Sequence, residues 1–320
     1  MAATGDDTLL DEHDTLRDER RRRVQAAAAS IAGGVLTIGG GALAAWVYTD
    51  LPTVRVLDAL RERFAASEPM PGLKALQVRW YDDNAVRLIL VSVVLALAAA
   101  AIGLALTHLY RSVKARRPEL PKYIVYAAVA GAVLVAVSSI VQAVGVTLEA
   151  AAFADSADQT SDAAGDVLQG PAIVASLLLR QVGVFALGFA FILLALNGMR
   201  VGLLTRFMGV LGIIVGVLFI VPIGSSLPIV QAFWLVALGA LFLGRWPSGM
   251  PPAWVTGQAQ PWPTQQELRE ARLEAQGVPD ERRRTRAARR ERTEAPETPA
   301  PELPARRPHP SSKKRKRKRR

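Results

Sequence analysis

The sequence predicts an all-α polytopic membrane protein: a bundle of six transmembrane helices followed by a disordered basic C-terminal tail. Six apolar stretches approach or exceed the roughly 20 residues that a helix needs to cross a bilayer core of about 30 Å. Charged residues lie mostly between or outside these stretches. The whole net charge of +11 resides in residues 245–320, which carry 20 Lys and Arg against 9 Asp and Glu. That split describes a charged tail beside an apolar domain.

The six predicted spans form a transmembrane domain over residues 24–244, between a charged N-terminal segment, residues 1–23, and the tail. They cover residues 24–48, 86–110, 123–148, 172–199, 203–223 and 228–244. Long apolar runs favour helices, because a membrane helix satisfies its backbone hydrogen bonds internally. The first run is longer than the roughly 7–15 residues of a secretory signal core, which favours an uncleaved helix. The last two spans are short and joined by PIGSSLP, so the count of six depends on them.

The distribution of Lys and Arg in the flanks predicts the orientation. The N-terminal segment carries five Arg, and the loop RSVKARRPELPK carries five Lys and Arg in twelve residues, whereas residues 149–171 contain five acids and no Lys or Arg. Because basic loops stay on the cytoplasmic side, both termini and the tail are expected in the cytoplasm. Residues 149–171 are then outside, as a mobile or weakly helical acidic loop.

Small residues recur every four positions in two spans. Gly33, Thr37 and Gly41 lie in the first span, and Gly212 and Gly216 lie in the fifth. Such spacing lets helix backbones approach closely in lipid. These five residues are therefore predicted to mediate helix packing. The pattern leaves open whether the partner helix belongs to the same chain or to a helix-mediated oligomer.

A few polar side chains lie inside the predicted spans, where they are costly and often functional. Ser138, Gln142 and Glu149 follow helical spacing on one face of the third span, and Arg180 lies in the fourth. They predict an intramembrane polar site in the outer half of the bundle. In the alternative interpretation Arg180 only marks the outer interface, because it lies twenty residues, about 30 Å of helix, from Arg200.

Motifs for catalysis or cofactor binding are not found in the sequence. There is no cysteine, and the three histidines are far apart, which argues against a metal site. No phosphate-binding loop, zinc motif or nucleophile elbow occurs. We therefore expect no catalytic residue, no cofactor, no metal and no enzymatic activity.

The stretch NGMRVGLLTRFMGVLGIIVGVLFIVPIG, followed by PIVQAFWLVALGALFLG, resembles the C-terminal half of a family of six-helix bacterial integral membrane proteins of unknown function. The shared features are a basic turn with Arg206 before Phe207, a Gly-rich fifth helix and Trp234 in the sixth. The following RWPSGMPPAW is similar to membrane proteins of high-GC actinobacteria. The resemblance covers about residues 180–255 and implies a bacterial plasma membrane. It implies no activity and no catalytic residue.

The basic tail suggests a polyanion as partner. Its end is an unbroken cationic run: Lys313, Lys314, Arg315, Lys316, Arg317, Lys318, Arg319 and Arg320. On the cytoplasmic side such a cluster attracts anionic lipid headgroups, so a non-enzymatic membrane protein with a lipid-binding tail is the first hypothesis. A small-solute or ion transporter or channel using Arg180, Gln142 and Glu149 is the second. The third is a membrane tether for ribosomes or nucleic acid, without sequence specificity because no aromatic residue follows Trp262.

Overall fold

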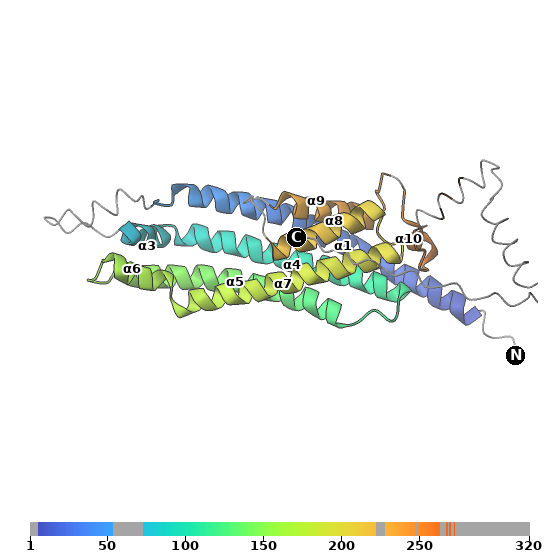
Figure 1. Ribbon diagram of the computed structural model, residues 1–320, viewed down its shortest axis with the longest axis horizontal. Helices are drawn as coiled ribbons and strands as arrows, with labels where there is room; N and C mark the ends of the chain where they lie inside the picture. The colour runs from blue at the N-terminus through green and yellow to red at the C-terminus, as the bar shows by residue number, and fades with distance from the viewer. Residues whose placement is uncertain are drawn as a thin grey trace, which may run out of the picture. The chain divides into compact units, whose positions relative to one another are not determined.

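A computed structural model describes residues 6–53, 73–221, 228–247 and 249–262, with single positions at 267, 269 and 272, and the side chains from Arg22 onward. The chain divides into two units, of which the first ends at Trp262. The helices, shown in Figure 1, are α1 Asp6–Val47, η1 Tyr48–Asp50, α3 Leu73–Asp83, α4 Ala85–Arg116, α5 Tyr123–Ala154, α6 Ser161–Leu168, α7 Pro171–Arg200, α8 Arg206–Ile220, α9 Ile229–Phe242 and α10 Pro252–Thr256. The described residues form helices and connecting segments, with no strand.

Four helical stretches are long and apolar enough to cross a membrane: Arg22–Asp50, Ala85–Arg116, Tyr123–Ala154 and Ser161–Arg200. They correspond to the first four predicted spans and extend beyond each of them at one or both ends. The sequence predicted a boundary after residue 23, between the charged N-terminal segment and the first span, but the structure has no break there. α1 runs without a break from Asp6 to Val47, so residues 6–23 belong to the same helix as the first apolar stretch.

The two remaining apolar helices are shorter than a bilayer core. α8 has 15 residues and α9 has 14, which corresponds to about 22 and 21 Å of helix. The predicted fifth and sixth spans are therefore present as helices, but each is shorter than the predicted 203–223 or 228–244. Most of the linker PIGSSLP lies in residues 222–227, outside the described residues.

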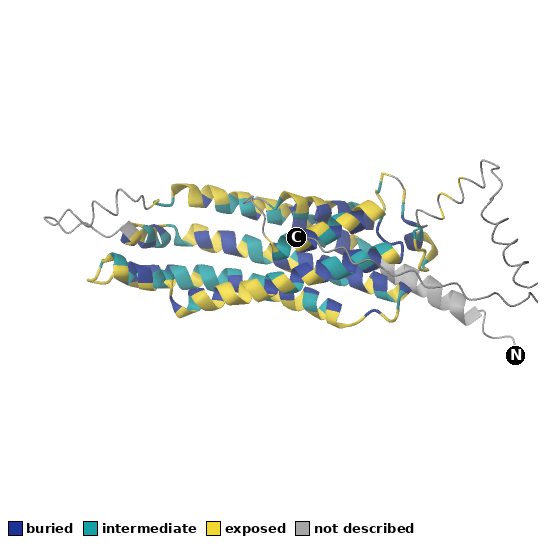
Figure 2. Cartoon of the chain, viewed as in Figure 1, coloured by how far each residue is buried: buried dark blue, intermediate teal, exposed yellow. Residues whose placement is uncertain are grey.

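The helices pack in a ring. α4 lies between α1 and α5, α7 packs against α5 and α4, α8 packs against α7, and α9 packs against α8 and α1. Figure 1 shows α3 and α6 at one end of the long helices and α10 at the other; we call these the α3 end and the α10 end. Figure 2 shows the buried residues gathered mainly where α8 and α9 overlie the long helices.

Glycines permit a close approach of the backbones of α7 and α8. A Cβ atom on Gly188 would lie 2.7 Å from the carbonyl oxygen of Gly216, and one on Gly216 would lie 2.6 Å from that of Gly188. A Cβ atom on Gly212 would lie 2.7 Å from the Cβ atom of Ala195. Gly212 and Gly216, singled out by their spacing, therefore face α7 of the same chain.

The stripe on α1 is less regular than its sequence suggests. A Cβ atom on Gly33 would lie 3.3 Å from Ile102 of α4, which is a tight contact, and the Thr37 hydroxyl donates to the Gly33 carbonyl at 2.6 Å. The closest approaches come from neighbouring glycines instead. A Cβ atom on Gly34 would lie 2.8 Å from the Ala232 carbonyl of α9, and one on Gly40 would lie 2.8 Å from Leu95. Gly41 is half-buried.

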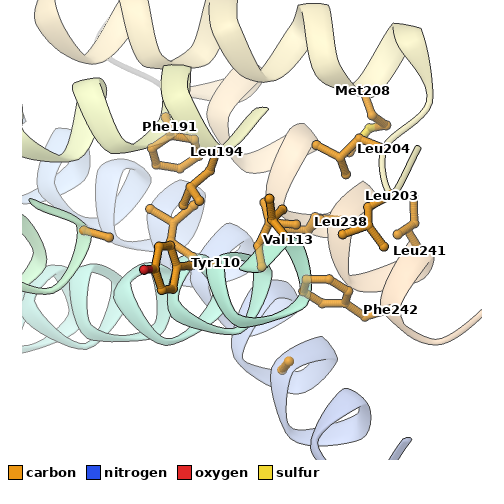
Figure 3. Close-up of a cluster of buried hydrophobic side chains, with 14 of the residues drawn as sticks. Tyr110, Val113, Phe191, Leu194, Leu203, Leu204, Met208, Leu238, Leu241 and Phe242 are labelled. Atoms are coloured by element: carbon orange, nitrogen blue, oxygen red, sulfur yellow. The ribbon is translucent and has the colours of Figure 1, made fainter. Parts of the chain in front are cut away.

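The main hydrophobic core lies between α4, α7, α8 and α9. Phe191 stacks against Phe219 and meets the edge of Trp234, and all three belong to or pack on this core. The Trp234 Nε1 donates to the Met208 carbonyl at 2.9 Å, which satisfies its buried polar atom. Figure 3 shows Tyr110 and Val113 of α4 with side chains of α7, α9 and the α7–α8 turn converging on the same region.

A second, smaller core lies at the α3 end. Ala75 and Val78 of α3 pack against Ala150 and Phe153 of α5 and Ala164 of α6. The loop predicted at residues 149–171 is therefore largely helical: α5 continues to Ala154, and α6 begins after Thr160, whose side chain accepts a hydrogen bond from the Ala163 amide. The sequence of residues 149–171 indicated no partner for this loop, because α3 supplies the apolar side chains from another loop.

Candidate functional site

Arg180 lies on the core-facing side of α7. It precedes Leu187, Phe191 and Leu194 by 7, 11 and 14 residues, and those three side chains are fully buried. At 3.6 residues per turn, residues with these spacings share one helix face. Arg180 is nevertheless exposed. The exposure of a charged side chain on the core-facing side of a helix needs a structural explanation.

The explanation is the short length of α8 and α9. The last residue of α8, Ile220, contacts α7 at Gly188, and Ala232 in the first turn of α9 contacts α1 at Gly34. Arg180 lies eight residues, about 12 Å of helix, beyond Gly188 toward the α3 end. The two short helices therefore stop before they reach Arg180.

The sides of the long helices beyond the ends of α8 and α9 form one region, which we call the open face. On α7 it contains Leu177, Arg180 and Gln181. These residues lie on the same faces of α7 as Leu187 and Gly188, nearer the α3 end. On α1 it contains Ile38, seven residues after Ile31, which contacts α9. On α5 it contains Gln142, seven residues after Val135, which packs on the main core. All but the half-buried Gln142 are exposed.

The four residues of the predicted polar site are only partly brought together. α5 and α7 are antiparallel, with Gly131 against Gly183 and Gly145 against Ala172. In this register Gln142 lies about five residues, or ~7 Å, from the level of Arg180, and Glu149 lies about 18 Å from it. Gln142 and Arg180 thus share the open face, although no hydrogen bond joins them. Ser138 is fully buried and donates to the Val135 carbonyl of its own helix at 2.9 Å.

Glu149 lies at the start of α7. A Cβ atom on Gly170 would collide with the Glu149 carboxylate, so the carboxylate occupies the space beside the N-cap residue of α7. The Oε2 atom is buried and has no hydrogen-bond partner. A carboxylate at this position interacts favourably with the positive end of the helix dipole. Glu149 therefore belongs to the α5–α7 junction, and it does not meet Arg180.

A second polar assembly, at the α10 end, was not predicted. Trp254 of α10 is 4% exposed, and its Nε1 donates to the Leu203 carbonyl at 2.8 Å. The guanidinium carbons of Arg23 and Arg116 lie 4.9 and 5.2 Å from the centre of its ring. Arg23 also donates to the Phe242 carbonyl at 3.0 Å. Cation–π contacts at such distances are favourable, more so when they are removed from water.

This assembly corrects the predicted boundary of the tail. Arg116 donates to the Ala253 carbonyl at 2.9 Å, the Gln260 amide donates to Val201, and the Trp262 Nε1 donates to Leu204. Residues 245–262, assigned to the tail from their prolines and charges, therefore belong to the folded first unit. The spacing of Trp246, Trp254 and Trp262 by eight residues is a sequence signal for such a segment, but the sequence does not identify the partners of these side chains. The cationic run from Lys313 to Arg320 lies outside the described residues.

Other buried polar groups at the α10 end lie on α4 and α7. Arg117 donates to the Asn197 side chain at 2.9 Å. The His108 Nε2, the Tyr110 hydroxyl and the Ser112 hydroxyl are buried without a hydrogen-bond partner, and the His108 ring meets the Phe242 ring edge-on at 5.0 Å. Among the residues that the structure describes, no three His, Asp or Glu side chains come together as metal ligands.

The two ends of the bundle differ strongly in charge. Among the described side chains of the first unit, ten at the α10 end are basic: Arg22, Arg23, Arg111, Lys114, Arg116, Arg117, Lys122, Arg200, Arg206 and Arg245. Glu119 is the one acidic residue among them. The described acids at the α3 end are Asp50, Asp82, Asp83, Glu149, Asp155, Asp158, Asp162 and Asp166, beside the basic residues Lys74, Arg79, Arg87 and Arg180. Hydrogen bonds from Thr160 hold the pKa of Asp158 below its usual value.

The fold and its two polar assemblies define an all-helical protein with apolar helices of membrane-spanning length. Comparisons with protein-family models, curated proteins and solved structures gave no match.

Proposed function

We propose that the chain is a non-enzymatic protein of the bacterial plasma membrane that crosses the bilayer six times, with both termini in the cytoplasm. The charge difference between the two ends carries this proposal, because membrane proteins keep Lys and Arg on the cytoplasmic side. The α10 end is then cytoplasmic and the α3 end is outside. Trp46, Tyr48 and Trp80 near the α3 end fit the aromatic belt of an outer interface. The bacterial plasma membrane is the expectation that the sequence resemblance of residues 180–255 implies, and it is part of the proposal.

Six crossings require α8 and α9 to span with less than the usual length. Their ~22 Å of helix falls about 8 Å short of the bilayer core. A bilayer thins around a short span at modest cost. A hairpin that enters and leaves on the cytoplasmic side is the competing topology.

The topology can be tested with single cysteines, because the chain contains none. We expect Asp158→Cys to react with a membrane-impermeant maleimide in intact cells, and Lys122→Cys to react only after permeabilisation. Asp158 and Lys122 are both exposed, so accessibility within the fold is matched. Ser225→Cys in the α8–α9 connection is expected to react from outside. The opposite pattern at Asp158 and Lys122 would overturn the orientation, and a Ser225→Cys that reacts only from inside would overturn the sixfold crossing.

We further propose that the tail binds anionic lipid headgroups or another cytoplasmic polyanion through Lys313–Arg320. A basic residue near an anionic surface contributes about 1 kcal/mol. The chain in neutral nanodiscs is expected to bind vesicles containing phosphatidylglycerol at low salt. Removing residues 313–320 is expected to weaken this binding by about tenfold or more. Removing Pro299–Ala305, which contains no Lys or Arg, is the control for tail length. Binding that survives loss of the cationic run would contradict this proposal, and salt-sensitive co-sedimentation with ribosomes would instead favour the tether.

Transport of a small solute or ion is a second candidate function. The observation that favours it is the position of Arg180 and Gln142 on the open face, where polar groups lie beside the core of the bundle. The separation of Glu149 from both weakens it. Transport that is lost in Arg180→Leu and kept in Glu149→Ala would support this candidate.

A further inference from the structure

Arg180 lies at a depth where a membrane presents phosphate groups. Twenty residues of continuous α7 separate it from Arg200 at the α10 end, which corresponds to about 30 Å, one bilayer core. Side chains on a helix lean toward its N-terminus, and the N-terminus of α7 lies at the α3 end. The guanidinium therefore points from the edge of the hydrocarbon layer toward the headgroups.

No counter-ion of Arg180 lies among the residues that the structure describes. Within the described part of the chain, Arg180 forms no ion pair and no hydrogen bond, in contrast to Arg23, Arg116 and Arg117. Gln142 and Gln181, both on the open face, add amide groups that can donate hydrogen bonds. The polar groups around Arg180 are thus suited to an anion with several acceptor oxygens.

The surroundings of this cationic group are apolar. Ile38 on α1 is 39% exposed and Leu177 on α7 is 49% exposed, on the sides that α8 and α9 cover nearer the α10 end. Ile229 in the first turn of α9 is 58% exposed. A ligand that fits here carries an anionic group toward Arg180 and hydrocarbon toward these side chains.

We propose that the open face holds one phospholipid of the leaflet at the α3 end, with its phosphate on Arg180 and its acyl chains over Ile38, Leu177 and the ends of α8 and α9. A guanidinium binds phosphate through two parallel hydrogen bonds. Arg180 lies on the same face of α7 as the buried Leu187 and Phe191. The lipids that surround the bundle contact the opposite face of α7, so the proposed site is distinct from them. The inference rests on the membrane placement proposed above, although not on which side is cytoplasmic.

The test measures lipid affinity of the full chain in a non-ionic detergent. The delipidated protein is titrated with short-chain phosphatidylglycerol, and bound lipid is counted by native mass spectrometry. We expect Arg180→Gln to weaken binding of the retained lipid about tenfold, the effect of losing a charge-assisted pair of hydrogen bonds. Arg180→Lys, which keeps the charge and loses the planar fork, should fall in between.

Arg87→Gln is the matched control. Arg87 also lies at the α3 end, but its guanidinium already contacts Asn84 at 3.1 Å and lies over the Trp46 ring, so its loss should leave lipid affinity unchanged. Equal affinity in wild type and Arg180→Gln, or an equal loss in Arg87→Gln, would overturn the proposal. Displacement of the lipid by inorganic phosphate at the same concentration would assign the site to a soluble anion and overturn it too. A reversed cysteine-labelling pattern would leave this measurement unaffected, so the two proposals fail separately.

Discussion

Replacing Trp254 by alanine is expected to lower the free energy of unfolding by about 3–5 kcal/mol, the usual cost of removing a buried Trp side chain. The loss combines several contacts at one place. The indole donates to the Leu203 carbonyl, meets the Phe242 ring edge-on at 5.9 Å, and lies within cation–π distance of Arg23 and Arg116. Removing it leaves a cavity between two guanidinium groups.

The measurement is the unfolding transition in mixed micelles, followed by circular dichroism during titration with a denaturing detergent. Val255→Ala is the matched control, because Val255 is the next residue of α10 and is 68% exposed. It should change stability by no more than about 0.5 kcal/mol. If Trp254→Ala unfolds at the same detergent fraction as Val255→Ala, the segment from Arg245 to Trp262 does not stabilise the bundle.

Gly188→Ala is expected to destabilise the bundle by about 1–3 kcal/mol, although alanine is the better helix former. Its Cβ atom would lie 2.7 Å from both the Gly216 carbonyl oxygen and Ile220. The first of these is backbone and cannot move without separating α7 from α8. Because α8 contacts the core through this crossing, the strain should extend to the packing of Trp234.

Gly39→Ala provides the control for Gly188→Ala. A Cβ atom on Gly39 would meet nothing within 4 Å, so the same substitution should leave stability unchanged or raise it by up to about 1 kcal/mol through helix propensity. Opposite signs for the two variants in the same unfolding assay are the expected result. A Gly188→Ala protein as stable as wild type would mean that α8 does not pack on α7 at this distance.

The sequence predicted the helices better than their partners. Apolar length determines where a membrane helix forms, and this is a local property. Gly212 and Gly216 could be identified as packing positions from their spacing, yet the spacing did not indicate whether the partner was α7 or another chain. Trp254 lies in RWPSGMPPAW, which the sequence marks by a resemblance, and Arg116 contacts α10 across 137 residues of sequence. A local pattern contains no information about such a partner.

The sequence alone determined the helical class, the four long apolar helices and the uneven charge, because composition and periodicity act within each segment. Only the tertiary structure decided that residues 245–262 fold onto the bundle, that Glu149 belongs to the start of α7, and that Arg180 remains uncovered. Each outcome depends on where one helix ends relative to another. Arg180 is exposed because α8 ends at the level of Gly188, and this level is set by the packing of α7 against α8.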